Sequence, residues 1–422
     1  MNYSEALEYI HSVSWTFCKP GLERIKELCA ALGNPQDKLK FVHVAGTNGK
    51  GSVCAFLESI LRAQGYKTGL FTSPYVRKFN ERMAINGEPI DNDELAELTA
   101  FVKPFADKMT DKPTEFELIT AIGFLYFAKH SCDIVVLETG MGGRLDATNI
   151  IKNPILSIIT GISLDHVAFL GSTVEQIAFE KAGIIKNGTA VLFGGEDEKA
   201  GEVIRTQAAK TGARFYQTDF RELKNVETSL EGAKFDFGNF RNQKISLLGI
   251  YQPKNAATVL TAVEILRQRG VFISDKSVMQ GLATTVWHAR FEIISKNPLI
   301  IFDGAHNLEG ITAAVESIKK YFGSKVYVLT GVLKDKDYEA IAKAISTVAS
   351  RAFAITPDNP RALSAKEYAR ILMGHGVSVE SFDSMKEAFV SAKNTAQKRG
   401  VPLVCLGSLY TYGTLMDIIE NE

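Results

Sequence analysis

The sequence has few cysteines and no excess of either charge. Its five cysteines are odd in number and include no closely spaced pair: Cys18, Cys29, Cys54, Cys132 and Cys405. This pattern argues against a disulfide framework and a structural zinc site, and it favours a reducing, cytoplasmic location. Lysine plus arginine and aspartate plus glutamate each number 48. Because such a balanced chain has no long-range field to steer it onto a polyanion, we expect no nucleic-acid partner.

Long apolar runs are also missing. No run approaches the roughly 18 residues that a transmembrane helix needs. The N-terminal segment MNYSEALEYIHS predicts an amphipathic helix with acidic groups rather than a targeting sequence. We therefore expect no membrane partner. At 422 residues, the chain exceeds the roughly 100 to 200 residues of one domain, so two soluble domains are predicted.

Short runs rich in β-branched residues alternate with longer helical patterns. From Phe41 to about Gly195 the runs are FVHVA, TGLFT, DIVVLE, ILSIIT and AVLF, which predicts a parallel sheet covered by helices. The alternation resumes after Arg290 in LIIFD, KVYVLT, AFAIT, VSVES and PLVCLG, with a helical stretch over residues 338–350. This second part predicts a smaller Rossmann-like α/β domain. A hairpin (KFDFGNFRNQKISLL) and a helix from about Asn255 lie between, and we place the domains at 1–288 and 289–422.

A glycine-rich turn stands between a buried strand and a helix in FVHVAGTNGKGSVCAFLESILRAQG. Gly46, Gly49 and Gly51 let the backbone curl so that successive N–H groups face one point, and the helix N-terminus adds positive potential there. Lys50 would reach the terminal phosphates, and Ser52 supplies a hydroxyl for phosphate or Mg²⁺. An ordinary glycine-rich turn is the competing interpretation.

The loop departs from the general pattern G-x-x-x-x-G-K-[ST], which would place glycine at Val44 and a hydroxyl at Gly51. GTNGKGS instead resembles the phosphate loop of the Mur ligase superfamily, in its folylpolyglutamate synthase and dihydrofolate synthase branch. Further segments resemble that family in the same order: FTSPYVRKFNERMAINGEPI, LETGMGGRLDATN, SLDHVAFLG, FEKAGIIK, YQPKNAAT, ARFE, DGAHN, GVLKDKD and GSLY. Three positions depart from it: Tyr75 for histidine, Ala289 for glycine and Leu308 for proline.

The resemblance implies an ATP-binding Mur ligase domain over 1–288, with the fold of a P-loop ATPase, and a Rossmann-like ligase domain over 289–422. It implies a monomeric enzyme that uses ATP and Mg²⁺ to join L-glutamate to dihydropteroate, to reduced folates, or to both, through an acyl phosphate. One alternative is a Mur-type ligase for a nucleotide-linked cell-wall precursor, which should lack GLER and LDATN. Another is a GTPase-like switch, which predicts an Asn-Lys-x-Asp motif, but the chain has no Asn-Lys dipeptide.

The resemblance also assigns site residues. The catalytic residues would be Lys50, His166 and Lys181, and the Mg²⁺ ligands would be Ser73, Glu138, His166 and Lys181. The nucleotide would be bound by Gly46, Thr47, Asn48, Gly49, Lys50, Gly51, Ser52, Asn255, Arg290 and Asp303. Dihydropteroate would be bound by Gly21, Leu22, Glu23 and Arg24 of GLER and by Leu145, Asp146 and Ala147 of LDATN. His306 and Ser408 lie on loops that glutamate can approach, but no role is assigned to them.

Lys181 resembles the position at which this superfamily carries a carbamylated lysine, formed when a neutral amine captures CO₂. An ammonium group repels Mg²⁺, whereas a carbamate offers it two hard oxygens. The competing interpretation is a solvated helix lysine. The following residues Ala182 to Ile185 weaken it, because they indicate a helix end that runs into the core.

The other assignments have simpler structural interpretations as well. Ser73 is compatible with a turn before proline, Glu138 with the end of a strand, and His166 with a surface pair. Asn255 and Asp303 are compatible with helix or loop caps, and GLER with a helix that starts after the preceding proline.

Overall fold

The large first sheet is built around the strand that precedes the glycine-rich turn. The computed structural model describes residues 1–12 and 21–421, so Cys18 lies outside the described residues. The eight strands have the order β4-β3-β2-β5-β1-β6-β7-β8. Their bounds are β1 (Phe41–Ala45), β2 (Thr68–Phe71), β3 (Met83–Ile85), β4 (Glu88–Pro89), β5 (Ile134–Glu138), β6 (Leu156–Ile159), β7 (Ala190–Phe193) and β8 (Arg214–Gln217).

The five strands predicted for this domain are confirmed, but the sheet is not wholly parallel. Strands β2 and β5 to β8 pair in parallel around β1, whereas β3 and β4 add an antiparallel edge. The sequence pattern misses β3, β4 and β8. Strand β4 consists of two exposed residues, and β8 begins and ends with the exposed side chains of Arg214 and Gln217. Such short edge strands lack the apolar run that identifies a buried strand.

Helices cover both faces of this sheet. Along β5, Ile134 and Val136 pack into the core that contains α3, α9 and α10, whereas Val135 and Leu137 face the side of α2, α4 and α5. This alternation follows from the two-residue period of a strand. The bounds are α1 (Tyr3–Ser12), α2 (Glu23–Ala31), η1 (Pro35–Lys38), α3 (Lys50–Gln64), η2 (Phe79–Arg82), α4 (Asn92–Lys108), α5 (Glu115–Lys129), η3 (Ala147–Ile150), α6 (Val167–Leu170), α7 (Val174–Ala182), α8 (Glu198–Lys210), η4 (Phe220–Glu222), α9 (Gln252–Gln268) and α10 (Asp275–Thr284).

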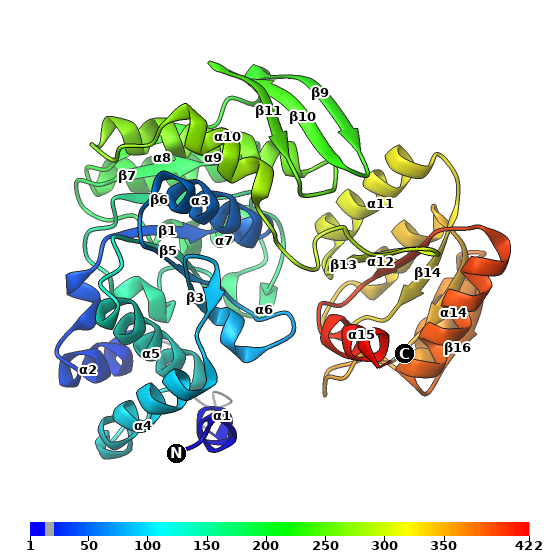
Figure 1. Cartoon of the computed structure of the whole chain (residues 1–422), viewed down its shortest axis with the longest axis horizontal. Helices are drawn as coiled ribbons and strands as arrows, with labels where there is room; N and C mark the ends of the chain where they lie inside the picture. Colours follow the sequence, from blue (N-terminus) through cyan, green and yellow to red (C-terminus); the bar gives the residue numbers. More distant parts are fainter. Residues whose placement is uncertain (13–20, 422) are drawn as a thin grey trace.

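A small antiparallel sheet lies on α9 and α10, at the top of Figure 1. Its order is β11-β10-β9, with β9 at Leu223–Ser229, β10 at Gly232–Phe237 and β11 at Phe240–Ile245. The pairing of β10 with β11 confirms the predicted hairpin. Helix α9 begins at Gln252, three residues before the predicted start, and its N-cap is Tyr251.

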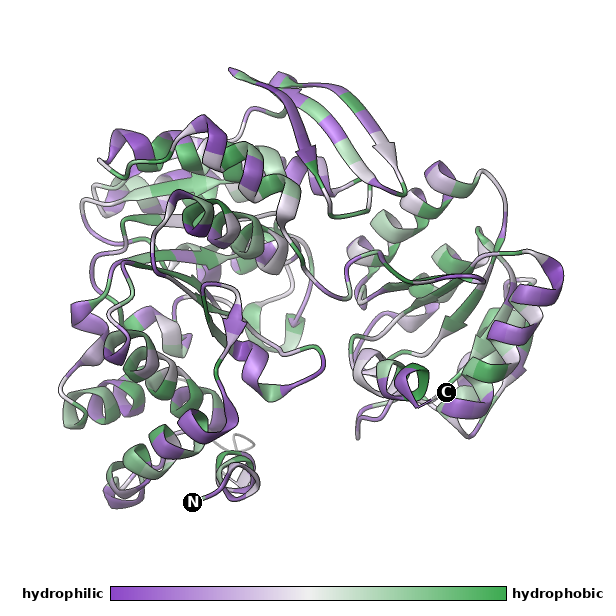
Figure 2. Ribbon diagram, viewed as in Figure 1, coloured by the Kyte–Doolittle hydropathy of each residue, from purple (hydrophilic) through white to green (hydrophobic). Residues whose placement is uncertain are grey.

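The second sheet, on the right of Figure 1, has the order β12-β13-β17-β14-β15-β16. Its strands are β12 (Glu292–Lys296), β13 (Leu299–Asp303), β14 (Val326–Thr330), β15 (Ala349–Ala354), β16 (Ser378–Ser381) and β17 (Leu403–Leu406). Its helices are α11 (Leu308–Phe322), α12 (Tyr338–Ser346), α13 (Ala365–Gly374), α14 (Met385–Arg399) and α15 (Thr411–Glu420). The five predicted strands are confirmed and pair in parallel, and β12 adds an antiparallel edge. Figure 2 shows hydrophobic residues on the central strands of this sheet and polar residues toward the outer faces of its helices.

The helix predicted over 338–350 is too long, because α12 ends at Ser346 and β15 begins at Ala349. The chain passes between the domains through residues 285–291, where Ala289 and Phe291 have φ angles of 57° and 46°. The boundary after residue 288 stays a prediction. None of the helices in the described residues is long and apolar enough to cross a membrane.

Candidate active site

The carboxyl ends of the first sheet's parallel strands open onto a cavity of about 610 Å³ between the two domains. The phosphate loop follows β1, Ser73 follows β2, Glu138 ends β5 and His166 follows β6. Because parallel strands end at the same edge of a sheet, residues far apart in the sequence meet there. The second domain contributes Asp303 and His306 to the opposite wall.

Every residue of the predicted phosphate loop, from Gly46 to Ser52, lines this cavity. Gly46 and Gly49 have φ angles of +149° and +86°, which favour glycine. A Cβ atom at Gly46 would lie 1.7 Å from the hydroxyl oxygen of Thr160, and one at Gly51 would lie 2.8 Å from the indole of Trp287. The loop is therefore packed so closely that its glycines have no room for side chains. Helix α3 begins at Lys50, within the glycine-rich segment.

Two lysines converge on the carbonyl oxygen of Gly46. Lys50 Nζ donates to it at 3.1 Å and to the carbonyl of Thr47 at 3.3 Å. Lys181 Nζ, from the last turn of α7, donates to the same Gly46 oxygen at 2.7 Å. Lys181 is 4% exposed, so its interpretation as a solvated helix lysine is wrong. Burial, reinforced by Lys50, lowers the pKa of Lys181 to about 7, which favours a neutral amine near physiological pH.

Glu138 and Ser73 lie next to each other in the cavity wall, beside the phosphate loop. The Glu138 carboxylate is 4% exposed, and it accepts a hydrogen bond from the Ser73 backbone N–H at 3.3 Å. Burial raises the pKa of Glu138, whereas Lys50 and the Ser73 N–H oppose this rise. The Ser73 hydroxyl accepts a hydrogen bond from Arg82 Nη1 at 3.2 Å. Two hard oxygen groups thus face the phosphate loop.

His166 stands at the start of the short helix α6, where its φ angle is 49°. Its backbone N–H donates to Asp165 Oδ1 at 2.8 Å. Partial burial lowers the pKa of His166, and Lys336, Lys50 and Lys181 add to this effect while Asp165 opposes it. A neutral imidazole keeps one ring nitrogen free to act as an acceptor or ligand.

Asp165 is not part of a surface pair, because it binds the second domain. It accepts from Lys336 Nζ at 2.7 Å, and these two side chains are 11% and 10% exposed. Burial disfavours the charged carboxylate, but Lys336 and His166 outweigh it and lower the pKa of Asp165. Asn307 Nδ2 also donates to Asp165, at 3.1 Å.

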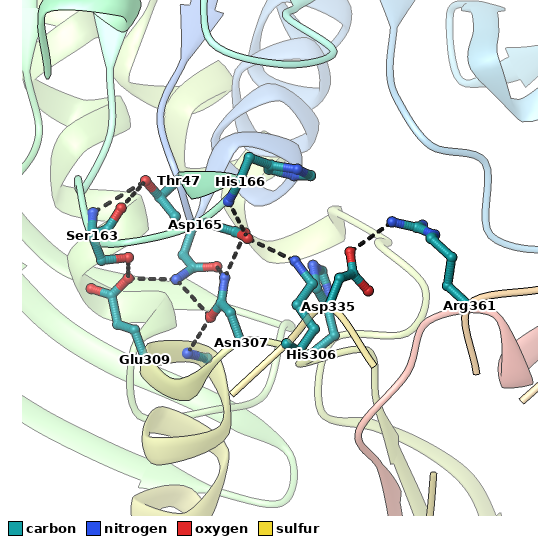
Figure 3. A network of polar contacts seen from close by, with 12 residues as sticks. Thr47, Ser163, Asp165, His166, His306, Asn307, Glu309, Asp335 and Arg361 are labelled. Carbon is teal, nitrogen blue, oxygen red and sulfur yellow. Dashed lines mark hydrogen bonds and ion pairs between the residues drawn. The ribbon is translucent and has the colours of Figure 1, made fainter. Parts of the chain in front are cut away.

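The same network reaches the phosphate loop itself. Asn307 Nδ2 donates to Asn48 Oδ1 at 3.1 Å, and the Asn48 amide donates to the carboxylate of Glu309. Glu309 accepts a further hydrogen bond from Ser163 Oγ at 2.6 Å. Figure 3 shows Asn307 and Glu309 of the second domain pointing toward Asp165 and Ser163 of the first. The phosphate loop, which belongs to the first domain, is therefore hydrogen-bonded directly to the second domain.

The predicted nucleotide residues Asn255, Arg290 and Asp303 all line the cavity. Asn255 is not the N-cap of α9; its side-chain amide donates to Gln252 Oε1 at 3.0 Å. A Cβ atom at Gly49 would lie 2.7 Å from Asn255 Oδ1, so this side chain covers the loop. Arg290 Nη1 donates to the backbone carbonyl of the preceding residue at 2.9 Å.

Asp303 is 2% exposed and is bonded within the protein. Its carboxylate accepts from the Tyr251 hydroxyl at 2.8 Å and from the backbone N–H groups of Phe291 at 3.0 Å and Ala305 at 2.8 Å. Burial raises the pKa of Asp303, and Arg290 opposes this rise. These contacts tie α9 to β13, which supports a positioning role at the domain seam.

The acceptor segments are not part of the cavity lining. None of the residues from Gly21 to Arg24, or from Leu145 to Ala147, contributes to it. They lie near one another, because α2 packs against η3. Arg24 Nε donates to Glu117 at 2.9 Å, and helix α2 begins at Glu23.

Asp146 is likewise bonded within the protein. It accepts from the backbone N–H groups of Thr148 at 3.1 Å and Met141 at 2.9 Å. A role for these segments in acceptor binding stays a prediction, and the side chains of Arg24 and Asp146 would have to exchange existing bonds to take part.

Sequence reasoning misses one end of the cavity. Gly194 to Asp197, which follow β7, line it together with Phe220, Tyr251 and Lys254. The ammonium group of Lys254 lies 5.4 Å from the centroid of the Phe220 ring. The position of residues 194–197 after a predicted strand is the signal that would have found them.

The donors around the loop fit Mg²⁺ better than a soft metal. No cluster of three or more histidine, cysteine or acidic side chains suited to a metal occurs in the described ranges 1–12 and 21–421. Mg²⁺ needs only one or two protein oxygens, because it keeps several waters and binds substrate phosphates. The Glu138 carboxylate and the Ser73 hydroxyl meet this need. Lys181 fits the set only as a carbamate, since an amine or ammonium supplies no oxygen.

Comparison with known proteins agrees with this arrangement. The family model described as Mur ligase middle domain matches residues 44–263, and the one described as Mur ligase, glutamate ligase domain matches residues 289–409. A dihydrofolate synthase/folylpolyglutamate synthase of Bacillus subtilis (strain 168) is 41% identical over 377 residues, which cover 86% of this chain and 87% of that protein. A folylpolyglutamate synthase of Lacticaseibacillus casei is 36% identical over 423 residues, covering 97% of each. A solved FPGS complex with AMPPCP and folate has a TM-score of 0.88 at 34% identity, and the match covers 99% of this chain and 100% of that one.

Proposed function

Because the chain belongs to the folylpolyglutamate synthase and dihydrofolate synthase branch of the Mur ligase superfamily, we propose that it joins L-glutamate to dihydropteroate and to reduced folates at the expense of ATP. The alternative acceptor, a nucleotide-linked cell-wall precursor, is less supported, because both relatives named above are folate enzymes. The proposed enzyme is a monomer of the cytoplasm.

One observation carries this proposal: a single cavity between two domains gathers a complete phosphate loop, a buried carboxylate and two lysines. An amide forms from a carboxylate at neutral pH only when the carboxylate first gains a good leaving group. Transfer of the γ-phosphoryl group from ATP to the carboxylate supplies that group. The site must therefore neutralise phosphate charge and align three reactants, which is mostly a matter of positioning and electrostatics.

The described residues suit these tasks. The curled loop and the N-terminus of α3 present N–H groups to the phosphates, and Lys50, which now donates to two loop carbonyls, is placed to exchange them for phosphate oxygens. Ser73, Glu138 and His166 would hold Mg²⁺, with Lys181 as its carbamate, and the bound ion would neutralise phosphate charge. Asn255 and Arg290 would hold the base and ribose beside the seam.

The acceptor would enter from the side of GLER and LDATN. Their occurrence together supports both activities, addition of the first glutamate and of later ones. The contact of α2 with η3 supports this assignment, because it brings two segments that are distant in the sequence to one place.

A single assay tests the proposed function. Purified enzyme is incubated with ATP, Mg²⁺ and radiolabelled glutamate, with dihydropteroate or tetrahydrofolate as acceptor, and labelled product and ADP are measured. Product from both acceptors is expected. Turnover of tetrahydrofolate alone would remove the dihydrofolate synthase activity, and no ADP with either acceptor would contradict the ligase assignment.

A further inference from the structure

Arg82 is a buried cation that has no ion-pair partner among the residues that the structure describes. Its residue is 8% exposed, and it forms no ion pair with any residue of 1–12 or 21–421. Arg24 is equally buried at 8% exposure, yet it is paired with Glu117 and Asp111. A buried charge is costly unless it is paired and hydrogen-bonded, so an unpaired one indicates a function.

The two carboxylates that act electrostatically on Arg82, Glu115 and Glu138, and the adjacent Glu81 all have other partners. Glu81, its neighbour in the chain, accepts hydrogen bonds from the backbone N–H groups of residues 76 to 78. Glu138 accepts from the Ser73 N–H, and Glu115 lies 3.4 Å from His11. Burial lowers the pKa of Arg82, and Glu115 and Glu138 oppose this only through space. The guanidinium thus has acidic surroundings, but no carboxylate of the described residues forms an ion pair with it.

The guanidinium is nevertheless held in a fixed position. It lies over the rings of Tyr75 and Phe79, with 5.1 Å and 5.5 Å to the centroids. Nη1 donates to Ser73 Oγ at 3.2 Å, and Nε is buried without a hydrogen-bond partner in the described part of the chain. Ser73 lines the cavity, although Arg82 itself does not. The unpaired Nε–H donor of Arg82 therefore lies behind Ser73 in the cavity wall, next to the proposed phosphoryl-transfer site.

We propose that Arg82 binds a carboxylate of the acceptor substrate beside the phosphate loop. A planar guanidinium matches a carboxylate in geometry, and charge-assisted bonds of this kind are among the strong ones. The carboxylate that is to be phosphorylated must come close to Ser73 and Glu138, which is where Arg82 lies. This inference rests on the proposed function, since it names the group that recognises the acceptor of that reaction.

Binding without turnover tests it. Affinities of pteroate and of its carboxamide are measured by titration calorimetry in the presence of a non-hydrolysable ATP analogue, for wild type, Arg82→Met and Arg267→Met. Arg267 is a matched control, because it also lies over an aromatic ring, Phe240, and is absent from the cavity lining. Wild type and the control should prefer the carboxylate by roughly 10- to 100-fold, as expected for hydrogen bonds to a charged group. Arg82→Met should lose this preference and bind the carboxamide as wild type does.

Two folate amides distinguish the possible sources of the carboxylate. If Arg82 binds the γ-carboxylate that is to be phosphorylated, Arg82→Met loses the preference for folate over folate γ-amide. If Arg82 binds the α-carboxylate of the glutamyl tail, Arg82→Met instead loses the preference for folate over folate α-amide. Either result supports the inference.

A folded Arg82→Met protein that still prefers carboxylates would overturn the inference. If that variant does not fold, Arg82→Gln replaces it, because glutamine keeps a donor for Ser73 without the charge. Failure of both neutral variants to fold would show that the charge serves only the fold, which also overturns the inference. Wild-type turnover is measured in parallel, so that absence of ligase activity, which concerns the proposed function, is separated from an unchanged carboxylate preference.

Discussion

Replacement of Lys181 by arginine tests whether this lysine acts as a carbamate. Arginine keeps the positive charge and much of the length, but it cannot capture CO₂. The ammonium group first loses one proton, and the neutral amine then adds to CO₂ and releases a second proton, so the side chain changes from a cation to an anion. The structure supplies the required amine, because Lys181 is 4% exposed and forms no ion pair within the described residues.

The lowered pKa of Lys181 determines how much of the side chain is the neutral amine that can react with CO₂. With a pKa of about 7 in place of the ordinary 10.5, roughly 90% of the amine is neutral at pH 8, compared with about 0.3% for an unperturbed lysine. The neutral form is therefore enriched about 300-fold. Because a rise in pH removes the proton, carbamate formation should increase from pH 6 to pH 8 and then level off. A site that loses its anion at a phosphoryl-transfer centre should lose roughly 100- to 1000-fold in kcat.

The assay compares Lys181→Arg with Lys186→Arg. Lys186 is a matched control, since burial also lowers its pKa, to about 8, while its Nζ donates to the Asn149 carbonyl rather than to the phosphate loop. Lys181→Arg should fold and lose activity, and the control should keep it. Wild type treated with ¹³C-bicarbonate should show a carbamate carbon signal that is missing from Lys181→Arg. Full activity of Lys181→Arg, with no such signal in wild type, would refute the reasoning.

Three further substitutions test the phosphate loop and the packing of the helix that follows it. Lys50→Ala should lower kcat roughly 100-fold or more while the unfolding midpoint changes little, because the hydrogen bonds of Lys50 within the described residues go to two loop carbonyls; near-normal turnover in the folded variant would contradict its role. Gly281→Ala should destabilise the protein by about 1 to 3 kcal/mol in urea unfolding, because the new Cβ atom would lie 2.5 Å from the Cα atom of Ile60 on α3. Gly374→Ala, with nothing within 4 Å, should instead stabilise it by about 0.5 to 1 kcal/mol, and equal effects of the two substitutions would refute the packing argument.

The sequence identifies residues that follow strands, because position along the chain determines which edge of a sheet they reach. The family resemblance assigns Ser73, Glu138 and His166 together, and all three lie at or after the ends of strands and line one cavity. Residue pairs that meet across the boundary between the two domains cannot be predicted from position along the chain. Asp165 and Lys336 are separated by 171 positions, and nothing in either segment identifies the other as its partner.

The burial of a charged side chain is also poorly determined by the local sequence pattern. The two interpretations of Lys181 require different degrees of burial, and burial depends on segments remote in the sequence. The backbone of Gly143 packs so closely that a Cβ atom there would lie 2.8 Å from the Lys181 carbonyl oxygen. Arg82 and Arg24 show the same limit, because both are equally buried and only the three-dimensional arrangement gives one of them a carboxylate partner.

The bonds from Asn48 to Asn307 and Glu309 make the phosphate loop a joint between the domains as well as a nucleotide cradle. Thermodynamic reciprocity then applies: whatever free energy the bound nucleotide adds to the association of the domains, their association must add to nucleotide binding. A fragment that ends at residue 288 would lack this contribution. Its nucleotide dissociation constant should therefore exceed that of the whole chain by the same factor by which nucleotide strengthens the association of the two separated domains.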